Sequence, residues 1–234
     1  MALQEITDHL HSLADSERAR HAVRYFKTGV GGYGYGDKFL GIRVPLIRQA
    51  VKQYADTSLG TAEKLLKSEY HEIRLFALLL LVSRFSRGDA AERDRIYRLY
   101  LNNTRYINNW DLVDSSAPRI VGAYLDDKDR SVLYALAKSS SLWERRIAVL
   151  ATFYFIGNGQ FSDALRIAEL LLNDPEDLIH KAVGWMLREA GKRDLAVEVA
   201  FLRDHYQKMP RTMLRYAIEK FSKAERHSYL TDAA

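Results

Sequence analysis

The chain has 234 residues, of which 47% are hydrophobic and 28% are charged, and it contains no cysteine. These values indicate a soluble globular protein with a sizeable core. The lack of cysteine excludes a disulfide scaffold, a thiol nucleophile, a cysteine-ligated zinc ion and an iron–sulfur cluster. The net charge of +5 is uneven, because 11 Lys and Arg stand against 7 Asp and Glu from Lys181 onward. A basic end favours a polyanionic partner such as nucleic acid.

The N-terminal segment MALQEITDHL is amphipathic and lacks the basic and apolar regions of a secretory signal peptide. The longest apolar run, from Leu75 to Val82, is far shorter than the roughly 20 residues that a membrane-spanning helix needs. We therefore expect a cytoplasmic protein without membrane contact.

Helical periodicity dominates the chain from end to end. Apolar residues recur at i, i+3, i+4 and i+7, and there are only 4 prolines. Asp174-Pro175 predicts a helix start with a cap and a first-turn proline, Gly191 predicts its end, and Met209-Pro210 separates the last two segments. The clearest helical windows are residues 18–28, 72–85, 143–156, 162–173 and 180–192.

A repeat appears when similar helical segments are aligned. Their anchor positions are separated by 36, 36, 35 and 34 residues, and they are Arg74, Trp110, Arg146, Lys181 and Arg215. This period is typical of solenoids built from helix pairs, in which neighbouring pairs stack because one pair cannot bury its own apolar stripe. The sequence therefore predicts an all-α, HEAT-like helical-repeat solenoid with a basic concave groove, as one domain over residues 1–234.

One irregular segment, residues 29–41, holds six of the 13 glycines; we call it the glycine loop. The GxGxxG spacing that begins at Gly29 matches the dinucleotide-binding pattern, which requires a preceding strand and a helix directly after it. A helical segment precedes the loop and the next helix is expected only near Pro45, so we reject a nucleotide site. The loop is either a plain connector or a backbone surface lying against phosphates, with Lys27 and Lys38 beside it.

The sequence offers no metal site and no familiar catalytic motif. His9 and His11 point about 200° apart on a helix and cannot chelate one ion, and the other histidines are scattered. There is no zinc-protease motif, no nucleophile elbow and no P-loop. We expect neither a metal nor a cofactor.

The segment NNWDLVDSSAP, residues 108–118, is the densest in functional residue types. Trp110 and Asp114 are four residues apart and share a helix face. Pro118 cannot donate to the carbonyl of Asp114, so the helix is expected to loosen there. The pair is either a functional carboxylate beside an indole or a core tryptophan with a solvated aspartate. Asp111 lies on another part of the turn, and its loss is expected to cost less.

Two later segments favour the functional interpretation. WERR, residues 143–146, supplies a second tryptophan and two guanidinium groups, and Trp185 lies on one face with Lys181 and Arg188. If equivalent helices line one groove, then Asp114, Arg146 and Trp185 come together from successive repeats. We expect Trp143 to be buried in the core and the other two tryptophans to line the groove.

These motifs resemble the AlkD-like DNA alkylation repair family, which are HEAT-like-repeat glycosylases that excise alkylated purines. The matching stretches begin at FKTGVGGYGYGDKFLGIRVPLIR, continue through NNWDLVDSSAP, WERRIAVL and HKAVGWMLREAGK, and end at PRTMLRYAIEKF near residue 221. The resemblance places the catalytic aspartate at Asp114, the groove tryptophans at Trp110 and Trp185, and the groove arginine at Arg146, with Arg145 beside it. The family pattern has a more polar residue at Gly32.

The resemblance implies a monofunctional glycosylase that removes cationic N3- and N7-alkylated purines from double-stranded DNA, with Asp114 stabilising the sugar cation. A lyase would need an amine nucleophile, and Lys181 is better interpreted as a phosphate contact. We expect a monomer that associates with the nucleoid when bound to DNA. The alternative is a non-catalytic repeat module that binds nucleic acid or a protein. The candidate DNA contacts are Lys27, Lys38, Arg145, Arg146, Lys181, Arg188 and Arg215.

Overall fold

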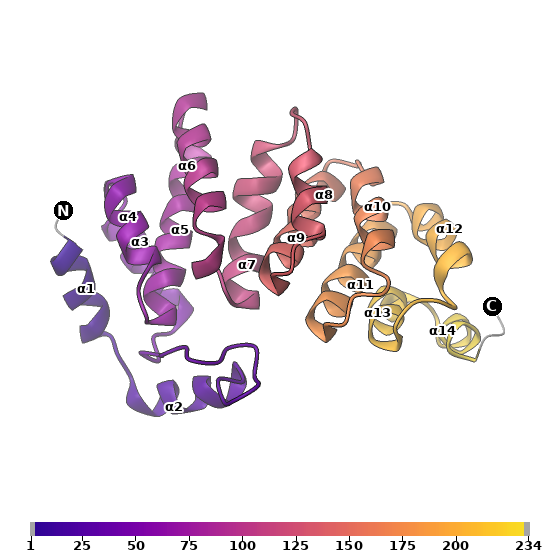
Figure 1. Cartoon of the computed structure of the whole chain (residues 1–234), viewed down its shortest axis with the longest axis horizontal. Helices are drawn as coiled ribbons and strands as arrows, with labels where there is room; N and C mark the ends of the chain where they lie inside the picture. Colours follow the sequence, from indigo (N-terminus) through magenta and orange to yellow (C-terminus); the bar gives the residue numbers. More distant parts are fainter. Residues whose placement is uncertain (1–2, 232–234) are drawn as a thin grey trace. The chain divides into compact units, whose positions relative to one another are not determined.

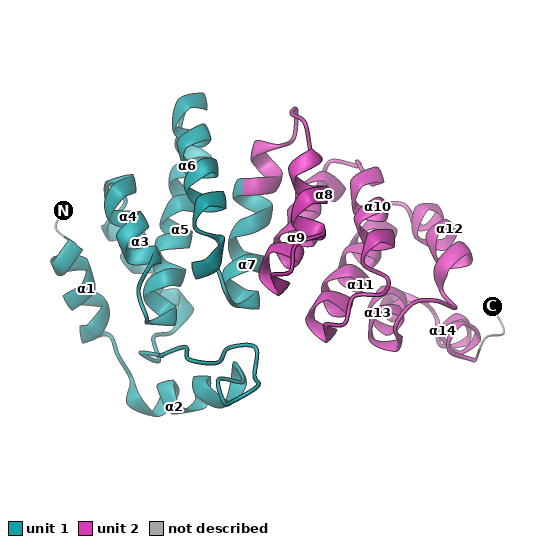
Figure 2. Ribbon diagram, viewed as in Figure 1, with its two compact units in different colours: residues 1–120 teal, residues 121–234 magenta. Residues whose placement is uncertain are grey.

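The computed structural model describes residues 3–231, and regular structure in this range is helical apart from one isolated β-bridge between Lys38 and Tyr70 (Figure 1). The all-α helical-repeat prediction is thereby confirmed. The chain divides into two compact units, residues 1–120 (unit 1) and 121–234 (unit 2) (Figure 2). No helix in the described residues is long and apolar enough to cross a membrane.

Unit 1 holds seven of the described α-helices, and short helical turns follow two of them. The α-helices are α1 (Leu3–Ser12), α2 (Ser16–Tyr25), α3 (Val44–Gln53), α4 (Leu59–Leu66), α5 (His71–Arg87), α6 (Ala90–Asn102) and α7 (Trp110–Ala117). A 3₁₀ turn spans Thr104–Tyr106 and a π-helical turn spans Pro118–Gly122, at the boundary with unit 2. The long helix α5 packs against α3, α4, α6 and α7, so most of it is buried.

Unit 2 repeats the same kind of helix pairing. Its α-helices are α8 (Ser131–Ala137), α9 (Leu142–Gly157), α10 (Ser162–Leu170), α11 (Asp177–Gly191), α12 (Leu195–His205), α13 (Arg211–Ala217) and α14 (Lys223–Leu230). The central helix α11 packs against α9, α10, α12 and α13. The apolar residues of α9 are distributed around nearly its whole circumference, as expected for a helix that is covered on most sides.

The period found in the sequence corresponds to one helix pair. The five anchor residues lie one on each of the odd-numbered helices α5, α7, α9, α11 and α13. Arg146, Lys181 and Arg215 each occupy the fifth position of their helix, Arg74 occupies the fourth position of α5, and Trp110 is the first residue of α7. The repeat is therefore a real structural register.

The start of α11 corrects one prediction. Asp174 and Pro175 do not cap this helix, which begins at Asp177 with Glu176 in the cap position. The carboxylate of Asp174 instead accepts a hydrogen bond from the backbone N–H of Glu176, at 2.9 Å, and forms a turn before the helix. The helix does end at Gly191, as predicted.

Two glycines of unit 2 lie where helices approach each other very closely. A Cβ atom on Gly122 would lie 2.3 Å from the carbonyl oxygen of Ala151, and one on Gly184 would lie 2.3 Å from that of Met213. Both distances are far below van der Waals contact, so only glycine permits these approaches. The glycine of the GWMLRE segment thus has a packing role.

Candidate active site

Helix α7 presents the predicted pair as expected. The side chain of Asn109, fully buried, accepts a hydrogen bond from the N–H of Trp110 at 2.9 Å and so fixes the first turn. The segment Trp110–Ala117 is α-helical, which places Trp110 and Asp114 on one face, and both are half-buried. The π-helical turn at Pro118–Gly122 confirms the predicted irregularity.

Trp110 packs against a cluster of aromatic rings. The Trp110 indole stacks on Phe26 with 5.5 Å between ring centroids, and Phe26 stacks on Phe39 at 5.1 Å. Tyr25, which is 66% exposed, meets the Trp110 ring edge-on at 6.0 Å. These rings come from the end of α2 and from the glycine loop, so both elements position the tryptophan.

A buried ionic network lies directly behind these rings. His71, at the start of α5, has its Nε2 atom 2.8 Å from Asp111 Oδ2 and its Nδ1 atom 3.5 Å from Asp37 Oδ2. Arg74 donates a hydrogen bond to Asp37 Oδ1 at 2.7 Å. The amide groups of Asn108 and Asn109 also donate to the Asp37 carboxylate, at 3.3 and 3.4 Å.

The network shifts the pKa of Asp37 and of His71 toward their charged forms. Burial disfavours the Asp37 carboxylate, but hydrogen bonding from His71 and the charge of Arg74 outweigh it and lower the pKa of Asp37 below 3.8. Burial likewise disfavours a charged His71, but its bonds to Asp111 and Asp37 raise its pKa above 6.5. Asp111 is therefore part of the ionic network, a contact that the sequence did not indicate.

The opposite side of α7 is anchored by a tyrosine. The hydroxyl groups of Tyr100 and Ser116 lie 3.0 Å apart in the core. Burial raises the pKa of Tyr100, and the nearby charge of Asp114 adds to this. Asp114 thus projects from a helix that is held on both sides.

The glycine loop accounts for the departure from the family pattern at Gly32. A Cβ atom there would lie 1.8 Å from the carbonyl oxygen of Lys27, a residue with a positive φ of 50°. The chain thus has no room for a side chain at Gly32. This tight turn favours the interpretation of the loop as a connector shaped by its own packing.

Gly32→Ala is expected to lower the free energy of unfolding by about 1–3 kcal/mol, because the turn must open to admit the methyl group. The matched control is Gly29→Ala, whose new methyl group would have no heavy atom within 4 Å. Urea denaturation of both variants measures the difference. Equal stability of the two variants would contradict the proposed cause.

In unit 2, Trp185 is held on α11 by neighbours from two helices. Its indole N–H donates to Glu189 at 3.2 Å, and its ring lies 5.8 Å from that of Phe153 on α9. Glu189 also pairs with Lys192 at 2.6 Å and with Arg193 at 3.3 Å. The spacing within GWMLRE thus has a local reason: Glu189, one turn after Trp185, orients the indole.

The two adjacent arginines of α9 are both engaged within unit 2. Arg146 is only 5% exposed, and its guanidinium donates to the carbonyl oxygen of Leu178 at 2.5 Å. Arg145 pairs with Asp174 at 2.6 Å and donates to two backbone carbonyls near the start of α9. Both arginines connect α9 to the beginning of α11.

The remaining predicted DNA contacts differ in how they are held. Lys38 pairs with Glu69 at 2.7 Å and Lys181 with Asp177 at 2.8 Å, both at the surface. Arg188 pairs with Glu219. Lys27 and Arg215 are exposed and form no ion pair with any residue between 3 and 231, although Lys27 lies 5.9 Å from the ring centroid of Tyr33.

One tryptophan prediction is wrong. Trp143, expected in the core, is only partly buried, as Trp110 and Trp185 also are. It is the second residue of α9, and the fully buried stretch of that helix begins three residues later at Arg146. Burial therefore does not separate Trp143 from the other two tryptophans.

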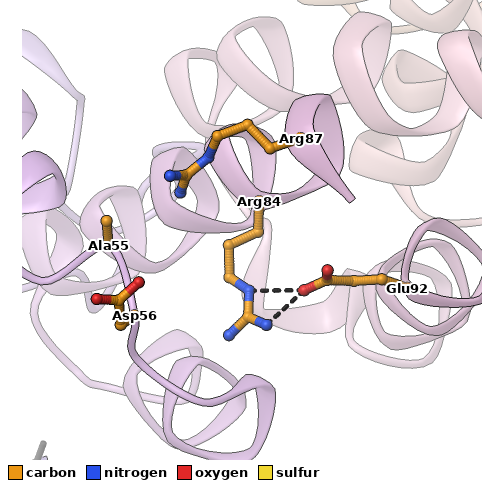
Figure 3. Close-up of a pocket in the computed structure, with 5 residues that line it drawn as sticks. All are labelled: Ala55, Asp56, Arg84, Arg87 and Glu92. Atoms are coloured by element: carbon orange, nitrogen blue, oxygen red, sulfur yellow. Dashed lines mark hydrogen bonds and ion pairs between the residues drawn. The ribbon is translucent and has the colours of Figure 1, made fainter. Parts of the chain in front are cut away.

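A cavity of about 250 Å³ lies at the other end of α5 and is lined by charged groups (Figure 3). Arg84 forms an ion pair there with Glu92 and donates to the carbonyl of Thr57. These contacts tie α5 to α6 and to the turn before α4, so we assign them to the fold. Within the described residues, no group of three or more His, Asp or Glu side chains could hold a metal ion.

Comparisons with known proteins identify the family of this chain. A family model described as DNA alkylation repair enzyme matches residues 6–221. The chain belongs to this family. A solved structure of a predicted DNA alkylation repair enzyme from Enterococcus faecalis shares the fold, with a TM-score of 0.69 and 18% sequence identity over 90% of this chain and 97% of that chain. No curated protein matches the sequence.

Sequence reasoning missed the ionic network of this DNA alkylation repair enzyme. The sequence patterns identified Arg74 only as an anchor of the repeat, and they indicated no function for Asp37 or His71. One signal was present: His71, Glu72 and Arg74 open a helix that is otherwise apolar. Charged residues in such a position are seldom buried without partners.

Proposed function

We propose that this enzyme is a DNA glycosylase that hydrolyses the N-glycosidic bond of cationic N3- and N7-alkylated purines. The observation that carries the proposal is the half-buried Asp114, on one helix face with Trp110 and beside a π-helical turn. Family membership supplies the damage class, alkylated DNA. It also favours an enzyme over the alternative of a non-catalytic repeat module.

The chemistry explains why a single carboxylate is sufficient. Ordinary glycosidases need a second carboxylic acid because the leaving oxygen must be protonated. A purine alkylated at N3 or N7 is already cationic and leaves as a neutral base, so no general acid is required. Asp114 stabilises the positive charge that develops on the deoxyribose and orients the attacking water.

The aromatic and basic residues have supporting roles in this proposal. Trp110 and Trp185 pack on deoxyribose and attract the cationic lesion through their π faces, at about 0.5–2 kcal/mol per contact. Arg146 adds positive charge near the start of α11, which favours phosphate there. Lysine amines are not required, so the enzyme leaves an abasic site without cutting the strand.

Duplex DNA binding is proposed to depend on phosphate contacts from exposed cations. We expect about four to six neutralised phosphates, so the logarithm of affinity falls with the logarithm of salt concentration at a slope of roughly −4 to −5. Arg215→Ala is expected to flatten that slope by about one unit for every sequence, because its side chain is exposed and makes no ion pair within residues 3–231. Salt titration with several unrelated duplexes measures this. A slope near zero, or preference for one undamaged sequence, would favour a protein partner.

The direct test of the proposed activity is release of free base. The purified protein is incubated with a duplex carrying a single 7-methylguanine, and the free base is separated and quantified against the spontaneous loss from the same duplex. Enzyme-dependent release with an intact strand supports the proposal. Absence of release from both 7-methylguanine and 3-methyladenine duplexes would refute it.

A further inference from the structure

The buried network behind Trp110 contains a histidine whose protonation state can be inferred from its neighbours. His71 is 2% exposed, and both of its ring nitrogens face carboxylate oxygens, of Asp37 and of Asp111. A neutral imidazole has only one N–H, so one of its nitrogens would present a lone pair to a carboxylate. The geometry therefore favours an imidazolium, which donates to both.

The charges also balance only in that state. Three charged groups face the His71 ring: Asp37 from the glycine loop, Arg74 from α5 and Asp111 from α7. Two carboxylates are then matched by one guanidinium and one imidazolium. The ring faces are covered by aromatic side chains, with Phe39 stacked at 4.8 Å between centroids. While His71 stays protonated, the network is therefore neutral overall and needs no ion from solvent to balance it.

We propose that His71, in its doubly protonated form, is a positioning residue for the reaction proposed above, on which this inference rests. Its two N–H groups tie the glycine loop, through Asp37, to the first turn of α7, through Asp111. That turn carries Trp110, and Asp114 follows one turn later. Loss of one proton leaves His71 with a single N–H, which can hold only one of the two carboxylates, so the link between the glycine loop and the first turn of α7 is broken and that turn loosens.

The first measurement is the pH dependence of excision. The carboxylates raise the pKa of His71 above 6.5, so the competent form is present at low pH and is lost as pH rises through that pKa. The single-turnover rate on 7-methylguanine DNA, after subtraction of spontaneous release, is expected to fall between pH 6 and 9. His71→Gln is expected to be about 10- to 100-fold slower at pH 6, with unchanged DNA affinity and no fall with pH.

The matched control is the adjacent residue. Glu72 is also buried, but its carboxylate accepts from the backbone N–H groups of Leu40 and Gly41, at 2.9 and 2.7 Å, and within residues 3–231 no hydrogen bond or ion pair joins it to α7. Glu72→Gln is expected to lower stability and to keep the wild-type fall in rate with pH. A merely structural role for His71 predicts the same behaviour for both variants.

Two further readouts do not depend on activity. Nitrogen chemical shifts of the His71 ring are expected to show both nitrogens protonated at pH 6.5, and hydrogen exchange of the α7 amides is expected to quicken as that proton is lost. A neutral ring at pH 6.5, or α7 exchange that ignores its titration, overturns the inference even if His71→Gln fails to fold. If wild type releases no base, the proposed function fails, while these two readouts still decide the role of His71.

Discussion

Asp114→Asn is expected to slow base release at least about 100-fold while DNA binding stays intact or becomes slightly tighter. The substitution preserves the shape of the side chain but removes the charge that stabilises the developing sugar cation, and loss of one such electrostatic contact costs 10²–10³ in rate. It also removes a negative charge from a surface that binds phosphates. Single-turnover excision of 7-methylguanine and a binding titration measure the two effects separately.

The choice of control for this experiment follows from the structure. Asp111 is unsuitable, because its carboxylate lies 2.8 Å from the ring of His71 and its loss disturbs the same helix. Asp56 is a better control, because it is an exposed carboxylate beside the cavity at the other end of α5. Asp56→Asn is expected to excise at the wild-type rate. An Asp114→Asn protein with full activity would remove this residue from the mechanism.

Glu198→Gln is expected to stabilise the protein at pH 8 and to have a much smaller effect at pH 5. Glu198 is 2% exposed, one of its oxygens has no hydrogen-bond partner, and burial raises its pKa from 4.5 to about 8 despite the nearby charge of Arg188. Between these pH values the unfolded chain releases the proton and the folded chain retains it. The free energy of unfolding therefore falls as pH rises across this window.

The size of this effect follows from the shift in pKa. Each unit corresponds to about 1.4 kcal/mol, so the gain from Glu198→Gln is expected to grow by about 3–4 kcal/mol between pH 5 and pH 8. Any fixed cost of burying the amide is the same at both pH values and cancels. Chemical denaturation of wild type and variant across this range measures it. Glu169→Gln, an exposed change on α10, is the control, and parallel curves for Glu198→Gln would show that Glu198 ionises at its usual pH.

The parts of this protein that sequence predicted are those governed by local periodicity. The helical windows and the face shared by Trp110 and Asp114 depend on residues within one or two turns of each other, and the repeat register depends on the recurrence of such local patterns every 34 to 36 residues. The irregularity after Asp114 follows from a single proline. These features emerged without knowledge of distant contacts.

The parts that it missed depend on partners far apart in the chain. Asp37 meets Arg74 and Asn109, which lie 37 and 72 residues away. Likewise, the guanidinium of Arg145 is neutralised by Asp174, 29 residues later. A sequence shows that such charges exist, but not whether another side chain in the fold already neutralises them, and so it overstates how many cations are available to DNA.

The two close helix approaches of unit 2 set limits on how its repeats can be altered. Gly122 and Gly184 each meet a carbonyl oxygen 29 residues further along the chain, and each meets a tyrosine Cβ 32 residues further along, at Tyr154 and Tyr216. Equal spacing in both places means that the number of residues between each glycine and its partner helix is fixed by the packing. A chimera that exchanges these helix pairs should keep both intervals, whereas one inserted residue within either would rotate the following helix by about 100° and force a side chain against the glycine.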